Sequence, residues 1–283
     1  MTTNRAASIR ARLKQHTDAT GEDFNLVLTR YGIERLLYRL AISEHATQFV
    51  LKGALLFALW YGHPHRPTRD ADLLGFGPDD PDVLAVVFRS LCTMQVDDGI
   101  RFEAASVRVG TIRKEARYGG VRVDIQATLD SARIALQVDV GYGDAVTPAP
   151  PTMVYPGLLR DVPTAPLRVY PKATVVAEKL HAVCLLGLTN SRMKDYFDLD
   201  LLLQDRELDD AELRKALIAT FQRRQLPLPA ALPQGLSDAF AADPGKRTQW
   251  AAFLRKNRLD GSDLETVVRR IRDRAAAIGL PTP

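Results

Sequence analysis

Residues 48–74, QFVLKGALLFALWYGHPHRPTRDADLL, show most clearly how the first half of the chain folds. It opens with a short apolar run of strand length, passes through Lys52-Gly53 into an apolar segment of helix length, and ends in a second short strand. Glycine and proline are frequent in residues 62–69, which predicts a loop before that second strand. The pattern therefore predicts strand, tight turn, helix, loop and strand, in that order.

The flanking segments predict an α+β half followed by a helical half. Apolar residues recur at helical spacing up to about Glu44, and residues 82–94 predict a further helix. From Arg101 to Val140 apolar and polar residues alternate, which predicts an antiparallel meander. Beyond Lys172 the sequence predicts only helices, at 172–187, 192–205, 209–224, 247–257 and 262–277. We expect a mixed or antiparallel sheet flanked by helices and followed by a C-terminal helical bundle.

A proline-rich segment separates the two halves. Seven prolines lie between Pro148 and Pro171, and such a density excludes a helix or a central strand. The chain has 283 residues, which is enough for two domains. We therefore expect domains at 1–165 and 166–283.

Composition excludes several classes of protein. With 46% hydrophobic and 25% charged residues, the chain is of ordinary globular type and not disordered. Its longest apolar run, residues 54–61, is far shorter than the roughly 20 residues of a membrane-spanning helix, and the first residues show no apolar signal segment. Two cysteines, Cys92 and Cys184, fit buried thiols of a reducing compartment. These features predict a cytoplasmic protein without a membrane partner.

The charge distribution favours an anionic partner. The net charge is only +4, but nine lysines and arginines lie between residues 245 and 283, against four acidic residues. A basic segment of this kind is typical of contact with a polyanion.

Asp70 and Asp72 form the first candidate site. Residues i and i+2 of a strand project from the same face, so the two carboxylates point the same way. They repel each other unless a cation lies between them, and oxygen ligands suit Mg²⁺, which bridges substrate phosphates. The alternative is a solvated strand end that binds nothing.

The Lys52-Gly53 junction strengthens the first interpretation. A glycine between strand and helix lets the backbone approach a phosphate, and a helix N-terminus offers unpaired N–H groups. The alternative is a glycine that only begins a buried helix. The strand–glycine–helix junction followed by an Asp-x-Asp strand is a much rarer combination than the junction or the Asp-x-Asp pair alone.

A third carboxylate would complete a metal site of the two-ion type. Asp139 ends an alternating strand and a glycine-rich turn follows it, which favours Asp139 as the third ligand. Asp124, in the preceding strand, has the same Val-Asp-[Ile/Val] surroundings and stays an alternative.

Two charged residues in the helical half also point inward. Lys179 lies in the middle of an apolar helical stripe, where desolvation is costly unless an anion meets the ammonium. Snorkelling of the long side chain to water is the alternative. Asp195 shares a helical face with Leu199 and Leu202, and both a buried salt bridge, with Lys179 as one partner, and a catalytic role are open.

In order, these residues resemble the AbiEii/AbiGii-type nucleotidyltransferase toxins of the DNA polymerase β-like nucleotidyltransferase superfamily. The resemblance runs from about residue 45 to residue 205. Its five motifs are Lys52-Gly53, the R-x-T-x-D-x-D segment 66–72, Asp139 at its strand end, AEKLHA at 177–182 and RMKDYFDL at 192–199.

The resemblance implies a nucleotidyltransferase-type sheet and a Mg²⁺-dependent transfer of a nucleoside monophosphate from an NTP. It implies the 3′ acceptor end of tRNA as the target, so that aminoacylation and translation are blocked. Transfer to a small molecule or a protein side chain by the same fold is the alternative. It further implies a bacterial toxin–antitoxin or phage-defence role and a cognate antitoxin, expected to be of the winged-helix type. A monomer is favoured.

Residue roles follow from the same resemblance. Asp70, Asp72 and Asp139 would hold the metals, and Asp195 would accept the proton of the attacking hydroxyl. The nucleotide would be bound by Lys52, Gly53, Arg66 and Lys179.

Two positions near these motifs bear on affinity and regulation. Family members commonly carry Gly and then Ser or Thr where this chain has Ala54 and Leu55. If the Ser or Thr hydroxyl of those members binds a phosphate, this chain is expected to have a weaker affinity for the nucleotide. A phosphate on Thr68 would place about 1.5–2 negative charges beside the NTP and repel it. The alternative is a threonine that only shapes the loop.

Overall fold

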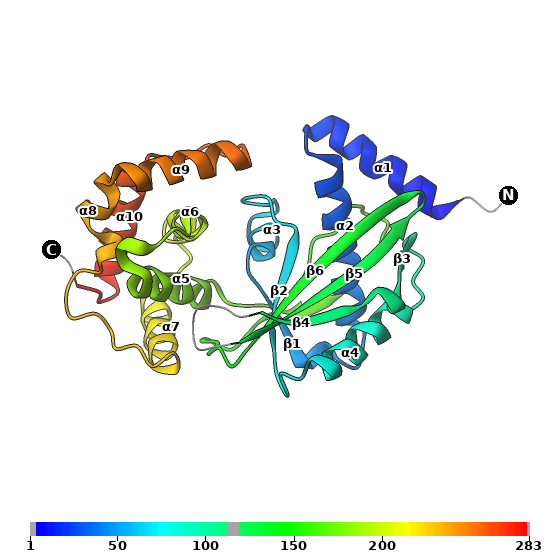
Figure 1. The fold of residues 1–283 in the computed structure, drawn as a ribbon, viewed down its shortest axis with the longest axis horizontal. Coiled ribbons are helices and arrows are strands. Elements are labelled where there is room, and N and C mark those ends of the chain that lie inside the picture. Colours follow the sequence, from blue (N-terminus) through cyan, green and yellow to red (C-terminus); the bar gives the residue numbers. More distant parts are fainter. Residues whose placement is uncertain (1–3, 113–118, 282–283) are drawn as a thin grey trace. The chain divides into compact units, whose positions relative to one another are not determined.

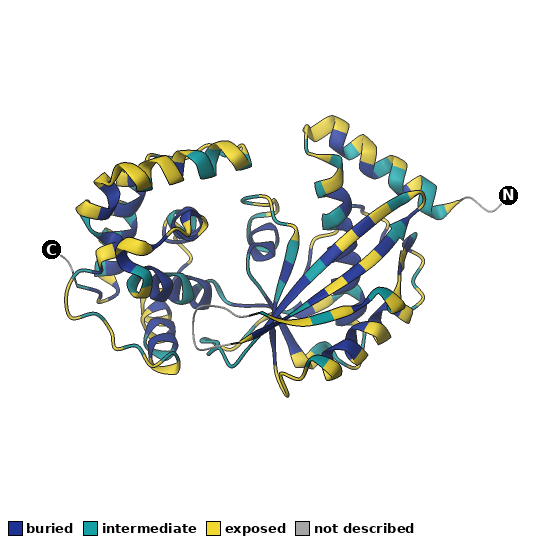
Figure 2. Cartoon of the chain, viewed as in Figure 1, coloured by how far each residue is buried: buried dark blue, intermediate teal, exposed yellow. Residues whose placement is uncertain are grey.

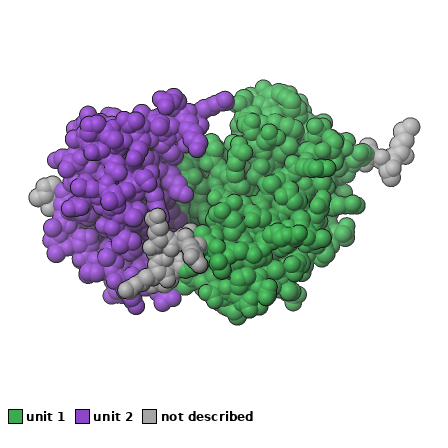
Figure 3. Space-filling model, viewed as in Figure 1, with its two compact units in different colours: residues 1–143, 151–169 green, residues 144–150, 170–283 purple. Residues whose placement is uncertain are grey.

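The computed structural model describes residues 4–112 and 119–281 (Figure 1). The chain divides into two compact units, coloured separately in Figure 3. Unit 1 comprises residues 1–143 and 151–169, and unit 2 comprises residues 144–150 and 170–283. The boundary expected from the prolines, between residues 165 and 166, lies four residues before the last change of unit.

Unit 1 is built around one mixed sheet, which has six strands in the described part of the chain. Its order is β1-β2-β6-β5-β3, with β4 paired to β5 as well. The β2–β6 pair is parallel and the other pairs are antiparallel, so the expected α+β fold class is confirmed. The strands are β1 (Phe49–Lys52), β2 (Asp70–Gly75), β3 (Ile100–Phe102), β4 (Arg108–Ile112), β5 (Gly120–Leu129) and β6 (Ala132–Tyr142).

The two faces of this sheet differ sharply in polarity. Alternate residues of β5 and β6 are buried and apolar, and most of the residues between them are polar and more exposed, as the banding of the strands in Figure 2 shows. Helices cover the apolar face: a Cβ at Gly32 would lie 2.9 Å from Leu136 of β6. Because successive side chains of a strand point to opposite faces of the sheet, the other face can carry the charged side chains. The helices of unit 1 are α1 (Arg5–Thr20), α2 (Phe24–Ala41), α3 (Leu55–Tyr61) and α4 (Pro81–Thr93).

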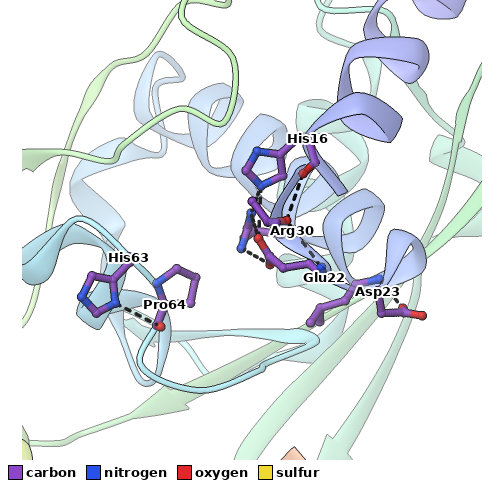
Figure 4. A network of polar contacts seen from close by, with 8 residues as sticks. His16, Glu22, Asp23, Arg30, His63 and Pro64 are labelled. Carbon is purple, nitrogen blue, oxygen red and sulfur yellow. Dashed lines mark hydrogen bonds and ion pairs between the residues drawn. The ribbon is translucent and has the colours of Figure 1, made fainter. Parts of the chain in front are cut away.

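The helical stretch expected up to Glu44 is interrupted between α1 and α2. Gly21 ends α1 in the left-handed region (φ 72°), and the Asp23 side chain caps α2 by accepting the Leu26 N–H. Across this break, Glu22 accepts hydrogen bonds from Arg30 and lies 3.1 Å from His16 (Figure 4). The two helices are thus joined by a polar network as well as by their apolar faces.

The proline-rich segment packs onto α2 through buried polar contacts. Arg35 donates to the Pro163 carbonyl (2.7 Å), and Glu34 accepts from the Leu158 N–H (2.8 Å). Because both side chains are almost fully buried, these bonds fix the path of the segment instead of leaving it as a loose linker. It contains a small two-stranded sheet, β7 (Thr152–Val154) and β8 (Pro166–Arg168).

Unit 2 is helical in its described part, as expected. An aromatic cluster of Phe197, Trp250 and Phe253 packs α6 against α9. The five-residue helix α8 was not expected from the sequence, because it is too short to show a periodic pattern. The helices are α5 (Lys172–Leu186), α6 (Met193–Leu202), α7 (Asp210–Arg223), α8 (Asp238–Ala242), α9 (Pro244–Asn257) and α10 (Leu264–Ala277). Over the described residues, every helix is too short or too polar to cross a membrane.

Candidate functional site

A row of four charged residues crosses the polar face of the unit 1 sheet. Register pairs Lys52 with Asp72, Asp72 with Asp139, and Asp139 with Arg122, on β1, β2, β6 and β5. Neighbouring strands lie about 4.8 Å apart, so each side chain stands directly beside the next. Asp70, two residues before Asp72 on β2, projects from the same face.

The strand order distinguishes the two candidates for a third carboxylate. Asp139 lies directly beside Asp72, because β6 is the parallel neighbour of β2. Asp124 lies on β5, two strands from β2, with Gln137 between it and Asp70. Carboxylates that share a metal ion must approach within a few ångströms, so the geometry favours Asp139 as a ligand. Its role as a ligand stays a prediction.

Arg122 holds the Asp139 carboxylate in a two-pronged ion pair. Its Nε and one terminal nitrogen each donate to a different Asp139 oxygen at 2.9 Å. The Gln137 amide oxygen, turned toward the guanidinium, accepts at 3.1 Å. The hydrogen bond to Asp139 raises the pKa of Arg122. The sequence did not single out Arg122, because only the β5–β6 register brings it to Asp139.

Gly53 is required by the position of Asp72. It has a φ of 78°, and a Cβ there would lie 2.1 Å from Asp72 Oδ2. The turn between β1 and α3 therefore places backbone against the carboxylate, which any larger residue would displace. Beside this turn, the Lys52 ammonium reaches over β6, 3.7 Å from the position of a Cβ at Gly141.

The loop before β2 is tied to the site by Thr68. Its hydroxyl donates a 2.5 Å hydrogen bond to Asp70 Oδ1. Arg66, in the same loop, is partly buried. The loop therefore bears directly on one of the two carboxylates of β2.

In unit 2, Lys179 and Asp195 are bonded to each other. The Lys179 ammonium lies 2.7 Å from Asp195 and 2.9 Å from Asp198, joining α5 to α6. Their side chains are 14%, 9% and 1% exposed, so the ammonium is met by carboxylates and does not snorkel to water. Asp198 was missed as a site residue, although its spacing of three from Asp195 on one helix was the available signal.

The five expected catalytic residues belong to both units. Asp70, Asp72 and Asp139 lie in unit 1, and Lys179 and Asp195 lie in unit 2. The structure brings together the members of each group. That the two groups meet in one pocket stays a prediction.

The unit 1 carboxylates have the chemistry that a hard cation requires, but they are not arranged around one. Over residues 4–112 and 119–281, no three His, Cys, Asp or Glu side chains form a ready metal site. Asp139 directs its oxygens at Arg122 instead. Asp70, Asp72 and Asp139 offer only oxygen donors on adjacent strands, which suits Mg²⁺ once Asp139 turns from Arg122.

The remaining histidines and cysteines have structural surroundings. His63 contacts the carbonyl of Pro64 at 3.4 Å within its own loop (Figure 4). Burial, and then the charge of Arg224, lower the pKa of His181 to about 4. Burial raises the pKa of Cys92 to about 11 and that of Cys184 to about 12, so neither thiol ionises near neutral pH.

This fold, a mostly antiparallel sheet with Asp-x-Asp on the strand that follows a glycine turn, is that of a nucleotidyltransferase. The family model described as "Nucleotidyl transferase AbiEii toxin, Type IV TA system" matches residues 35–274. The chain therefore belongs to the AbiEii family of toxin nucleotidyltransferases, as the sequence motifs predicted.

Solved structures of similar fold agree with this family. MenT4, a nucleotidyltransferase toxin from Mycobacterium tuberculosis H37Rv, is 17% identical, with a TM-score of 0.55 over 96% of this chain and 99% of its own. JHP933 from Helicobacter pylori is also 17% identical, with a TM-score of 0.51 over 89% and 91% of the two chains. No curated protein matches the sequence. Because the sequence identity is only 17%, the similarity to these two structures shows the fold alone.

Proposed function

We propose that this toxin transfers a nucleoside monophosphate from an NTP to the 3′ acceptor end of tRNA, with Mg²⁺, and thereby blocks aminoacylation. The observation that carries the proposal is the parallel register of Asp72 and Asp139, with Asp70 on the same face beside the Lys52-Gly53 turn. Membership of the AbiEii family supports the nucleotidyltransferase part of the proposal.

In this reaction the acceptor hydroxyl attacks the α-phosphorus of the NTP. A new O–P bond forms, the bond to the β-phosphate oxygen breaks, and pyrophosphate leaves. Bound Mg²⁺ would neutralise the charge that develops on the attacking and leaving oxygens. We assign its binding to Asp70, Asp72 and Asp139, whose carboxylates would hold the cation on the polar face of the neighbouring strands β2 and β6.

The proposed domain 166–283 supplies the other reacting groups to the proposed domain 1–165. We assign triphosphate binding to Lys179 and acceptance of the hydroxyl proton to Asp195. The two side chains form an ion pair, so both roles require that this contact open when substrate arrives. Lys52, Gly53 and Arg66 would bind the nucleotide from unit 1.

The test is transfer of labelled nucleotide to RNA. Purified protein is incubated with total tRNA, Mg²⁺ and one labelled NTP at a time. We expect labelled tRNA with the wild type and none with Asp72→Asn. Asp124→Asn is the matched control: it removes a carboxylate from the same sheet face, two strands from β2, and should retain activity. Label on a small molecule or on protein, with none on RNA, would instead favour the alternative acceptors.

We further propose that phosphorylation of Thr68 silences the toxin. The Thr68 hydroxyl already bonds to Asp70, so a phosphate would add its charge at that carboxylate and repel both the cation-binding groups and the NTP. Incubation with ATP and the product of the neighbouring gene, followed by mass spectrometry of the loop peptide, tests this. Inhibition without modification of Thr68 would contradict it.

The antitoxin and the oligomeric state are proposals of the same kind. Membership of a type IV toxin–antitoxin family implies an antitoxin, and we expect an adjacent gene for a winged-helix protein. We expect the toxin itself to be a monomer by light scattering.

A further inference from the structure

Two arginines with a threonine between them form a second row across the same face of the sheet, farther along the strands than the carboxylates. Register pairs Arg101 of β3 with Thr128 of β5, and Thr128 with Arg133 of β6. Both arginines are exposed and Thr128 is partly exposed. Thr128 lies six residues along β5 from Arg122, and Arg133 lies six along β6 from Asp139. These even spacings place the row on the face that carries the carboxylates.

The two arginines have no acidic partner among the residues that the structure describes. They lie two strands apart, about 10 Å between backbones, so their charges repel each other across Thr128. Asp130, in the turn between β5 and β6, faces Arg10 instead (3.9 Å). Glu103, just after β3, is exposed and forms no ion pair with Arg101 in the described chain. An anion bound over Thr128 would relieve this repulsion.

The distance between the two rows matches an extended ligand. From Asp139 to Arg133 the β6 strand spans six residues, or about 20 Å. In the row just before the arginines, Gln126 of β5 stands beside Ala135 of β6, and Glu103, whose backbone N–H donates to the Gln126 carbonyl, borders that row at the end of β3. A small nucleotide held at the carboxylates cannot reach so far, but a polynucleotide whose reacting end lies there passes over the arginines several nucleotides away.

We propose that Arg101 and Arg133, with Thr128 between them, bind the phosphate backbone of the acceptor RNA away from its reacting end. This inference rests on the proposed function and names the surface that holds its substrate. Guanidinium groups suit phosphate oxygens, and such contacts position a nucleic acid without reading its sequence. The sheet face thus separates a cation-binding end from a phosphate-binding end.

The test compares a double variant with a matched control. Arg101→Ala/Arg133→Ala removes two charges from the polar sheet face. Arg89→Ala/Arg160→Ala removes two exposed charges of unit 1 from α4 and from the segment that packs on α2. Binding of total tRNA is titrated without NTP at several salt concentrations. We expect about tenfold weaker binding, and a slope of log affinity against log salt smaller by about 1.4, only in the first variant.

Kinetics and charge rescue separate binding from folding. In transfer assays the first variant should raise the KM for tRNA while kcat and the KM for NTP stay the same. Arg101→Lys/Arg133→Lys should restore most of the salt slope, because it keeps the charge. Equal RNA affinity and slope in both alanine double variants would overturn the inference and leave the proposed function intact. If the wild type labels no RNA, the proposed function fails, and the titration alone decides whether the arginines bind RNA.

Discussion

Gly53→Ala tests the geometry of the site most directly. At a φ of 78° an alanine costs about 1–2 kcal/mol of unfolding free energy, because its Cβ crowds the backbone in the left-handed region. The new Cβ would also lie 2.1 Å from Asp72 Oδ2 and 2.8 Å from Asp72 Cβ. Carbon and oxygen need more than 3 Å, so the carboxylate must move by about 1 Å. A displacement of that size can reduce a rate by about 100-fold.

Gly62→Ala is the control for the backbone cost. Gly62 ends α3 with a φ of 76°, and no atom lies within 4 Å of its Cβ position. Both variants should lose about 1–2 kcal/mol in urea unfolding, and only Gly53→Ala should lose nucleotidyl transfer, measured as initial rates well below the unfolding transition. If the two variants transfer nucleotide at rates within a factor of two, Gly53 does not position Asp72 and the reasoning is wrong.

Three further predictions concern stability and metal binding. Lys179→Met should lower the unfolding free energy by about 3–5 kcal/mol, because Asp195 and Asp198 are both left buried without their cation. A loss below about 1 kcal/mol in urea unfolding would contradict this account of the ion pairs. For His181, whose folded pKa is lowered to about 4 from 6.5, the unfolded chain binds a proton that the folded chain does not. Stability should therefore fall as the pH drops from about 6.5 to about 4, by up to roughly 3 kcal/mol, and His181→Gln should flatten that part of the pH profile; an unchanged profile would refute the assignment. Arg122→Gln should tighten Mn²⁺ binding several-fold in calorimetry without NTP, because the guanidinium no longer competes for Asp139; unchanged affinity would argue against Asp139 as a ligand.

Part of the site was predictable because it depends on near neighbours in the chain. Two carboxylates at i and i+2 share a face of any strand, so the pairing of Asp70 with Asp72 needed no knowledge of the sheet. The inward direction of Lys179 and Asp195 followed from helical spacing in the same way. The salt bridge between Lys179 and Asp195 was one of the two interpretations that the sequence left open. That Asp198 also meets the Lys179 ammonium did not follow, because only the packing of α5 against α6 brings both carboxylates to it.

Local sequence patterns predicted most of the longer strands and helices and the polar or apolar character of their faces, since those properties arise from contacts a few residues apart. They did not predict the break between α1 and α2 or the short helix α8. Tertiary structure alone decided that β6 lies parallel to β2, and so that Asp139 and not Asp124 stands beside Asp72. The same pairing brought Arg122 to Asp139 and aligned Arg101 with Arg133 across Thr128. Strand order depends on the packing free energy of the whole sheet. Two strands with the same alternating pattern cannot be assigned to their positions in the sheet from their local sequence.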